Sequence, residues 1–135
     1  MTEEPTKGVQ LVSDLAAEKH HLLRVQRHFL LCIGPSCYST QEGNDLWDYL
    51  KLRLREANLA DDKQDLVYRS KVGCLRICGD GPIGLVYPEG TWYRRLDKKA
   101  IDRIISEHLI NGNVVKEYQF SETRLVAPFL PLESK

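Results

Sequence analysis

Apolar and polar positions along the first half of the chain predict two strands separated by a helix. Short apolar runs from His28 to Ile33 and from Leu66 to Val72 are typical of strands, and Gly34-Pro35 stops the first run. Between them, apolar residues at helical spacing predict a helix from about residue 40 to residue 58, preceded by a Ser-x-x-Glu capping box at residues 39–42. The polar stretch 60–65 then predicts a turn before the second strand.

The second half predicts a hairpin and a second main helix. Residues 83–87 and 92–95 flank a turn at Pro88-Glu89-Gly90-Thr91 and are expected to pair as strands. Asp97 is the predicted N-cap of the second helix, which ends at the Asn111-Gly112-Asn113 signal. His108 lies on the apolar stripe of this helix near its end. We therefore expect it to have a structural role, packed in the core and favoured by the helix dipole, rather than to bind a metal.

The two ends of the chain carry weaker patterns. Residues 1–8 predict a loose terminus, and residues 9–27 predict a short helix with Ser13 as its N-cap. His20 and His21 are neighbours and would point to different faces of that helix, so we interpret them as solvated residues rather than metal ligands. After the second main helix a short extended piece is predicted. Beyond Ser121 the tail is apolar and its prolines exclude a helix, so it is expected to pack on the body of the protein or on a partner.

Composition limits the classes of function. The chain has 135 residues, enough for one domain, with 42% hydrophobic and 28% charged residues. Its net charge is zero, so it has no overall field that would attract nucleic acid or an anionic membrane surface. No stretch approaches the roughly 20 apolar residues of a membrane helix. The polar, acidic first residues are unlike a secretory signal segment, and we expect a cytoplasmic protein.

Candidate chemistry centres on the only four cysteines, which form two close pairs: Cys32 with Cys37, and Cys74 with Cys78. Each pair lies in a Gly/Pro-containing loop after a predicted strand, so one fold could bring both loops to the same end of a sheet. The positive end of the helix predicted from about residue 40 would favour a thiolate at Cys37. Paired cysteines in a reducing compartment are more often metal ligands or redox centres than structural disulfides.

Four thiolates at these spacings favour a [2Fe–2S] cluster, which needs two cysteine ligands on each iron. A structural zinc site is an alternative, although zinc knuckles commonly place two residues between paired cysteines. A thiol redox centre is a third interpretation, although neither pair has the Cys-x-x-Cys spacing. The Gly79–Gly84 segment lacks the dinucleotide-binding spacing, and the chain carries no hydrolase or phosphate-loop motif. We therefore expect a protein without substrate chemistry of its own.

The cysteine spacing together with its neighbouring residues carries a family resemblance. Gly-Pro follows the last cysteine at residues 81–82, and then come Val86-Tyr87-Pro88-Glu89-Gly90, Trp92-Tyr93 and the helix end Glu107-His108-Leu109-Ile110-x-Gly112. In these features the chain resembles the thioredoxin-like [2Fe–2S] ferredoxins, which are related to the small iron–sulfur subunit of NADH dehydrogenase.

The resemblance implies an α/β, thioredoxin-like fold with a central mixed β-sheet, two main flanking helices, and extensions at both ends. It implies a ferredoxin domain at residues 27–120, an N-terminal extension at 1–26 and a tail at 121–135. It further implies one cluster held by all four cysteines near the surface, and often a homodimer. The expected function is one-electron transfer between redox partner proteins. The alternative is a non-redox interaction module that holds zinc.

Three charged residues beside the cysteines are candidates for tuning the reduction potential or for docking a partner. Arg76 lies inside the second pair and Lys71 shortly before it, so both could offset the negative charge of a cluster or meet an acidic partner. Asp80 is expected to act in the opposite sense. All-cysteine clusters of plant type have reduction potentials of about −400 mV, which predicts a low-potential carrier.

Overall fold

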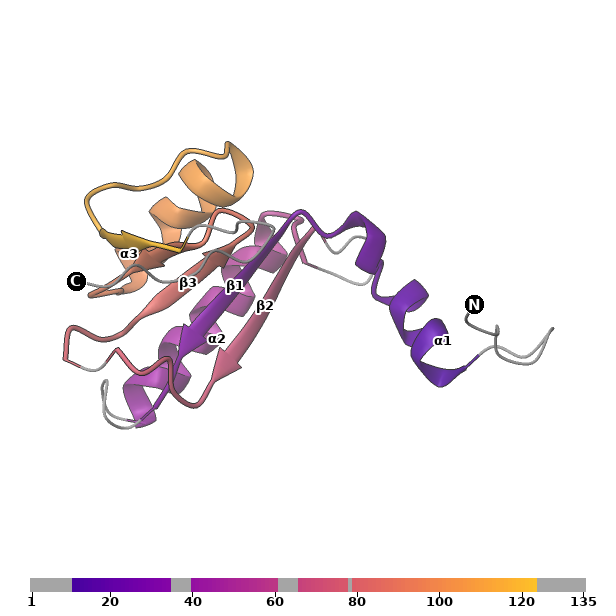
Figure 1. Ribbon diagram of the computed structural model, residues 1–135, viewed down its shortest axis with the longest axis horizontal. Coiled ribbons are helices and arrows are strands. Elements are labelled where there is room, and N and C mark those ends of the chain that lie inside the picture. Colours follow the sequence, from indigo (N-terminus) through magenta and orange to yellow (C-terminus); the bar gives the residue numbers. More distant parts are fainter. Residues whose placement is uncertain (1–10, 35–39, 61–65, 78, 124–135) are drawn as a thin grey trace, which may run out of the picture.

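The computed structural model describes residues 11–34, 40–60, 66–77 and 79–123. Its centre is a five-stranded sheet with the order β2-β1-β3-β4-β5 (Figure 1). The strands are β1 (Arg27–Cys32), β2 (Val67–Val72), β3 (Gly84–Tyr87), β4 (Thr91–Tyr93) and β5 (Gln119–Glu122). β1 is parallel to β2 and antiparallel to β3, and the pairs β3–β4 and β4–β5 are antiparallel. The predicted mixed sheet is confirmed.

Two helical elements cover one face of this sheet. They are α2 (Thr40–Glu56) and α3 (Lys98–Arg103), and α3 continues as a π-helical segment, Ile104–Ile110. Phe29 of β1 is paired with Val86 of β3, and Tyr93 of β4 is paired with Gly84, two residues before Val86. Because residues two apart in a strand point to the same side, the side chains of Phe29, Val86 and Tyr93 share one face of the sheet. These side chains form one buried cluster with Leu50 and Leu54 of α2, with Ile101 of α3, and with Ile104 and Ile105 of the π-helical segment. The two helices are also joined directly, because the Asp102 carboxylate accepts hydrogen bonds from Tyr49 and Arg53 at 2.8 and 2.9 Å.

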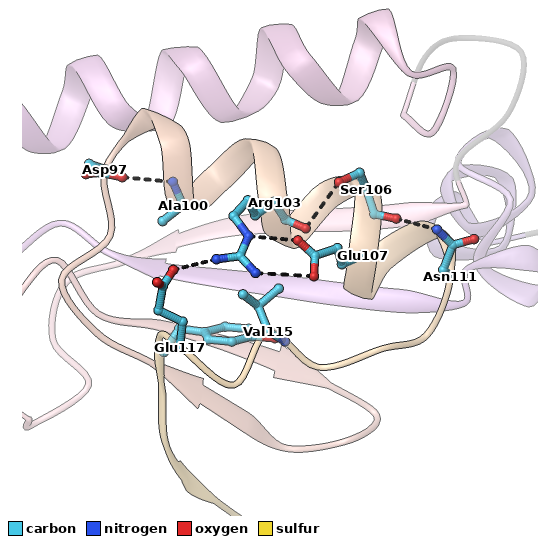
Figure 2. A network of polar contacts seen from close by, with 9 residues as sticks. Asp97, Ala100, Arg103, Ser106, Glu107, Asn111, Val115 and Glu117 are labelled. Carbon is cyan, nitrogen blue, oxygen red and sulfur yellow. Dashed lines mark hydrogen bonds and ion pairs between the residues drawn. The ribbon is translucent and has the colours of Figure 1, made fainter.

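The ends of α3 follow the sequence signals. The Ala100 amide donates to the Asp97 carboxylate at 2.8 Å, so the predicted N-cap is confirmed (Figure 2). The helical segment stops before Asn111, and Gly112 takes a left-handed conformation with φ of 76°. Between these ends, Arg103 forms ion pairs with Glu107 and Glu117, which ties the helix to the chain that leads into β5 (Figure 2).

The N-terminal helix differs from its prediction. α1 spans Val12–Lys19 and is followed by a 3-10 turn, Leu22–Arg24. Ser13 is not the N-cap, because the N-cap is Leu11, two residues earlier, and the Asp14 carboxylate accepts the Leu11 amide at 3.2 Å. This helix buries none of its residues and extends away from the sheet (Figure 1). His20 is exposed there, and its carbonyl accepts a hydrogen bond from Tyr68 at 3.4 Å.

Other boundaries agree within a few residues, with one exception in the hairpin. β4 ends at Tyr93, so the strand predicted at residues 92–95 is too long, and Arg95 adopts a left-handed backbone with φ of 53°. The extended piece predicted after the second helix is β5, which runs to Glu122. The predictions for residues 1–8, the turn at 61–65, Ser39 and the tail from residue 124 lie outside the described residues. Within the described part of the chain, no helix is long and apolar enough to cross a membrane.

Candidate metal centre

The parallel pairing of β1 and β2 brings the two cysteine loops to one end of the sheet. Cys32 is the last residue of β1 and is aligned with Val72, the last residue of β2. Cys74 follows Val72 by two residues. α2 begins at the same end, so its positive N-terminal dipole faces the region of the first loop (Figure 1). The sequence suggested this convergence, and the register establishes it for the described residues.

The two loops touch through their backbones. A Cβ atom placed on Gly34 would lie 2.2 Å from the carbonyl oxygen of Gly73 and 3.8 Å from the Cys32 sulfur. Around this contact, the Ile33 amide donates to the Val72 carbonyl at 3.0 Å, and the Cys32 amide donates to the Ile83 carbonyl at 2.9 Å. The first loop is therefore held against both the start and the end of the second loop.

The two described cysteines have different surroundings. Cys32 is fully buried, whereas Cys74 is exposed. The Cys74 sulfur accepts a hydrogen bond from the Arg76 amide at 3.2 Å, and Arg76 has a left-handed backbone with φ of 69°. Backbone N–H groups that point at sulfur are a feature of iron–sulfur sites, where they stabilise the negative charge on the thiolate ligands. A thiolate-bound group fits this donor arrangement.

Cys37 and Cys78 lie outside the described residues. Within the part of the chain that the structure describes, no three His, Cys, Asp or Glu side chains are grouped so that they could hold a metal ion.

Of the three charged candidates, Asp80 has described partners. Its carboxylate lies 3.5 Å from the Arg95 guanidinium and 4.0 Å from that of Arg94. Lys71, near the end of β2, and Arg76, in the second loop, are both exposed. The sequence places Arg94 and Arg95 in the predicted hairpin strand, so their contact with Asp80 was not expected. Two adjacent arginines after the Thr-Trp-Tyr segment are the sequence feature that points to this positive charge.

A second polar cluster lies at the other end of β1, about 16 Å along the strand from Cys32. His108 is fully buried, with Nδ1 2.7 Å from the Tyr93 hydroxyl and Nε2 2.9 Å from a Glu89 carboxylate oxygen. Arg27 donates to both Glu89 oxygens, at 3.1 and 3.0 Å. Because the Glu89 carboxylate can only accept, the proton of neutral His108 lies on Nε2 and is directed at Glu89, which leaves Nδ1 to accept the Tyr93 hydroxyl proton. The Tyr93 oxygen also accepts the Val115 amide at 3.0 Å. We call these four side chains the Arg27–Tyr93–Glu89–His108 clasp.

The clasp gives His108 the structural role that the sequence suggested. Burial lowers the pKa of His108 below its usual value, against the opposing effect of the Glu89 hydrogen bond. The side chain is therefore neutral near pH 7, and the expected dipole benefit of a charged histidine does not apply. Burial also raises the pKa of Tyr93 to about 12, which keeps its hydroxyl proton available for the hydrogen bond.

Comparisons with known proteins agree with this geometry. No protein-family model matches the chain. It is 43% identical over 102 residues to "Ferredoxin, 2Fe-2S" of Clostridium pasteurianum, which covers 73% of this chain and 99% of that protein. It is 31% identical over 106 residues to "Putative 2Fe-2S ferredoxin" of Priestia megaterium, which covers 76% of this chain and 79% of that protein.

A solved structure supports the fold assignment. The thioredoxin-like [2Fe-2S] ferredoxin from Aquifex aeolicus superposes with a TM-score of 0.63 at 20% identity, covering 78% of this chain and 99% of that one. This likeness confirms the thioredoxin-like fold. Together with the sequence identity to the two bacterial relatives, it shows that the chain belongs to the thioredoxin-like [2Fe–2S] ferredoxin family.

Proposed function

We propose that this chain is a one-electron carrier that holds a single [2Fe–2S] cluster on Cys32, Cys37, Cys74 and Cys78. The observation that carries the proposal is the backbone contact between Gly34 and Gly73, which joins the loops of the two cysteine pairs. Membership of a ferredoxin family supports the same conclusion, because the two bacterial relatives are named 2Fe-2S ferredoxins.

The surroundings of Cys74 suit a group that gains negative charge on reduction. A [2Fe–2S] cluster with four thiolate ligands supplies one-electron chemistry and becomes more negative when reduced. The Arg76 amide at 3.2 Å from the Cys74 sulfur would stabilise that added charge, and the positive side chains of Lys71 and Arg76 would act in the same direction. We expect a low-potential carrier, with a reduction potential of about −400 mV.

Analysis of protein purified without oxygen tests the cofactor. We expect a reddish-brown protein that contains iron and acid-labile sulfide in equal amounts and gives an electron-spin signal only after reduction. A colourless protein with one zinc per chain would instead support the interaction module. Disulfide-exchange activity that survives removal of the metal would support a thiol oxidoreductase.

Cysteine variants test the ligand assignment. Replacing Cys74 or Cys78 by serine should weaken or abolish the visible absorbance of the cluster, because serine oxygen is a poorer ligand for iron than thiolate sulfur. Ser121→Ala, at an exposed position in β5, is a control that leaves all four thiols in place. A Cys78→Ser protein with a normal cluster spectrum would remove Cys78 from the ligand set.

The proposal also assigns residues 27–120 as the ferredoxin domain, with residues 1–26 and 121–135 as extensions. It places the protein in the cytoplasm, where it would pass electrons between redox proteins without substrate chemistry of its own. Because α1 buries no residue, a chain that begins at residue 27 should still incorporate the cluster. Loss of iron from that shortened chain would show that the N-terminal extension is part of the domain.

A further inference from the structure

Two arginines that follow β4 lie along the second cysteine loop. The Arg95 amide donates to the Asp80 carbonyl at 2.9 Å, and the Leu96 amide donates to the Pro82 carbonyl at 3.1 Å. Asp80 follows Cys78 by two residues in the sequence. Backbone hydrogen bonds therefore hold residues 94–96 against the segment that follows the second cysteine pair.

The charges of these arginines are only partly neutralised. Arg94 and Arg95 share the single carboxylate of Asp80, at distances of 4.0 and 3.5 Å. All three side chains are substantially exposed, at 45%, 72% and 50%. Ion pairs with this exposure are weak, so a second carboxylate can replace Asp80 at small cost.

The described cysteine that is exposed to solvent belongs to the second loop, whose continuation at residues 80–82 contacts residues 94–96. Cys32, from the first loop, is fully buried, whereas Cys74, from the second loop, is exposed. Arg76 is also exposed beside Cys74, and Ile77 next to it is 41% exposed. An apolar centre with a polar rim is the usual composition of a protein–protein contact, and arginine is enriched in such contacts.

We propose that the exposed residues Arg76, Arg94 and Arg95, together with Ile77, form a docking surface for an acidic redox protein. We call these three arginines the arginine rim. The inference rests on the proposed function, because a docking surface beside the cysteines is useful only if they hold a redox group. The whole chain has no net charge, so attraction of an acidic partner must come from a local patch such as this one.

A competing surface has the opposite charge. α2 carries Asp45 and Asp48 on its exposed side, and a basic partner could approach there. The described contacts of these carboxylates are also exposed and weak: Gln41 donates to Asp45 at 3.0 Å, and Lys51 lies 3.5 Å from Asp48. Of the two described cysteines, the exposed one, Cys74, belongs to the second loop, whereas Cys32 of the first loop is buried, so the arginine rim is the better placed surface.

Reduction of two probe proteins by the cluster-loaded chain tests this inference. The probes are an acidic flavodoxin, which takes one electron to form its semiquinone, and a basic cytochrome c, which takes one electron to form ferrous haem. The rate for flavodoxin should fall as ionic strength rises from ~10 mM to ~1 M, where the Debye length shrinks from about 30 to about 3 Å. The rate for cytochrome c should rise or stay constant.

The double variant Arg94→Gln/Arg95→Gln identifies the residues. At low salt it should reduce flavodoxin about 3- to 10-fold more slowly than the unmodified chain, since local charges of this kind change association rates by at least that factor. The control is Arg55→Gln/Lys116→Gln, which removes the same number of positive charges from exposed positions in α2 and before β5. The control should retain the original rate.

The outcomes separate this inference from the proposed function. A chain without iron and visible absorbance contradicts the proposed function itself. A chain with a normal cluster spectrum, but with equal flavodoxin rates in the double variant and its control, contradicts only the arginine rim. Faster reduction of cytochrome c with a negative salt dependence would assign docking to the acidic side of α2 and would also overturn the inference.

Discussion

Gly34 and Gly73 touch across the two cysteine loops, yet alanine should be harmful at only one of them. On Gly34, a Cβ atom would lie 2.2 Å from the Gly73 carbonyl oxygen, whereas on Gly73 a Cβ atom would meet nothing within 4 Å. Ordinary carbon–oxygen contacts are about 3.3 Å, so Gly34→Ala must separate the loops by about 1 Å. A backbone carbonyl cannot rotate away as a flexible side chain can, because moving it displaces the chain between the end of β2 and Cys74.

The size of the effect follows from the cost of overpacking, which is about 1–3 kcal/mol. For a chain of this size, that cost corresponds to a decrease of roughly 4–11 °C in the midpoint of thermal unfolding at a fixed heating rate. We also expect less iron per chain in Gly34→Ala, because the loops would no longer meet correctly. Gly73→Ala should differ by less than about 0.5 kcal/mol and should load iron normally.

Circular dichroism and iron analysis of the two variants, prepared side by side without oxygen, provide the measurement. Equal stability and equal iron content in Gly34→Ala and the unmodified chain would refute the loop contact. Equal damage in both variants would mean that alanine acts through the backbone conformation of these loops rather than through the clash.

Three further predictions concern the body of the fold. Asp97→Ala removes the N-cap of α3 and should cost about 1 kcal/mol, whereas Asp97→Asn should retain most of the stability, as thermal unfolding will show. Gly90→Ala should destabilise the β4–β5 pairing, because Gly90 has φ of 71° and a Cβ there would lie 2.1 Å from the Thr123 carbonyl oxygen; faster amide exchange at Trp92 would report this. Because burial holds the pKa of His108 below that of an unfolded histidine, unfolding takes up a proton, and stability should fall as pH drops below about 6.5. His108→Gln should show a smaller fall between about pH 7.5 and 5.5, and an unchanged pH dependence would contradict this role of His108.

Local patterns in the amino-acid sequence were enough to predict most helices and strands and to name the candidate cysteine ligands. The alternation of apolar residues, the glycine and proline stops and the Asp97 cap are local signals, so they predicted α2, the strands β1 to β3 and the start of α3. Local signals failed where a backbone conformation set the boundary. Arg95 ends the hairpin strand through its positive φ, and the Leu11–Asp14 hydrogen bond moves the start of α1 away from Ser13.

Contacts between residues far apart in the sequence became visible only in the three-dimensional fold. The contact of Gly34 with Gly73, the pairing of Asp80 with two arginines, and the joining of Glu89 to His108 all depend on the strand order β2-β1-β3-β4-β5. Glu89 and His108 are 19 residues apart, and Arg27 and Glu89 are 62 apart, so no local pattern links them. Several of these residues lie in motifs that the sequence shows. Their contact partners, however, depend on the parallel pairing of β1 with β2 and on the packing of α3 against the sheet. Sequence neighbours set secondary structure, whereas the burial of one shared apolar face brings distant side chains and loops together.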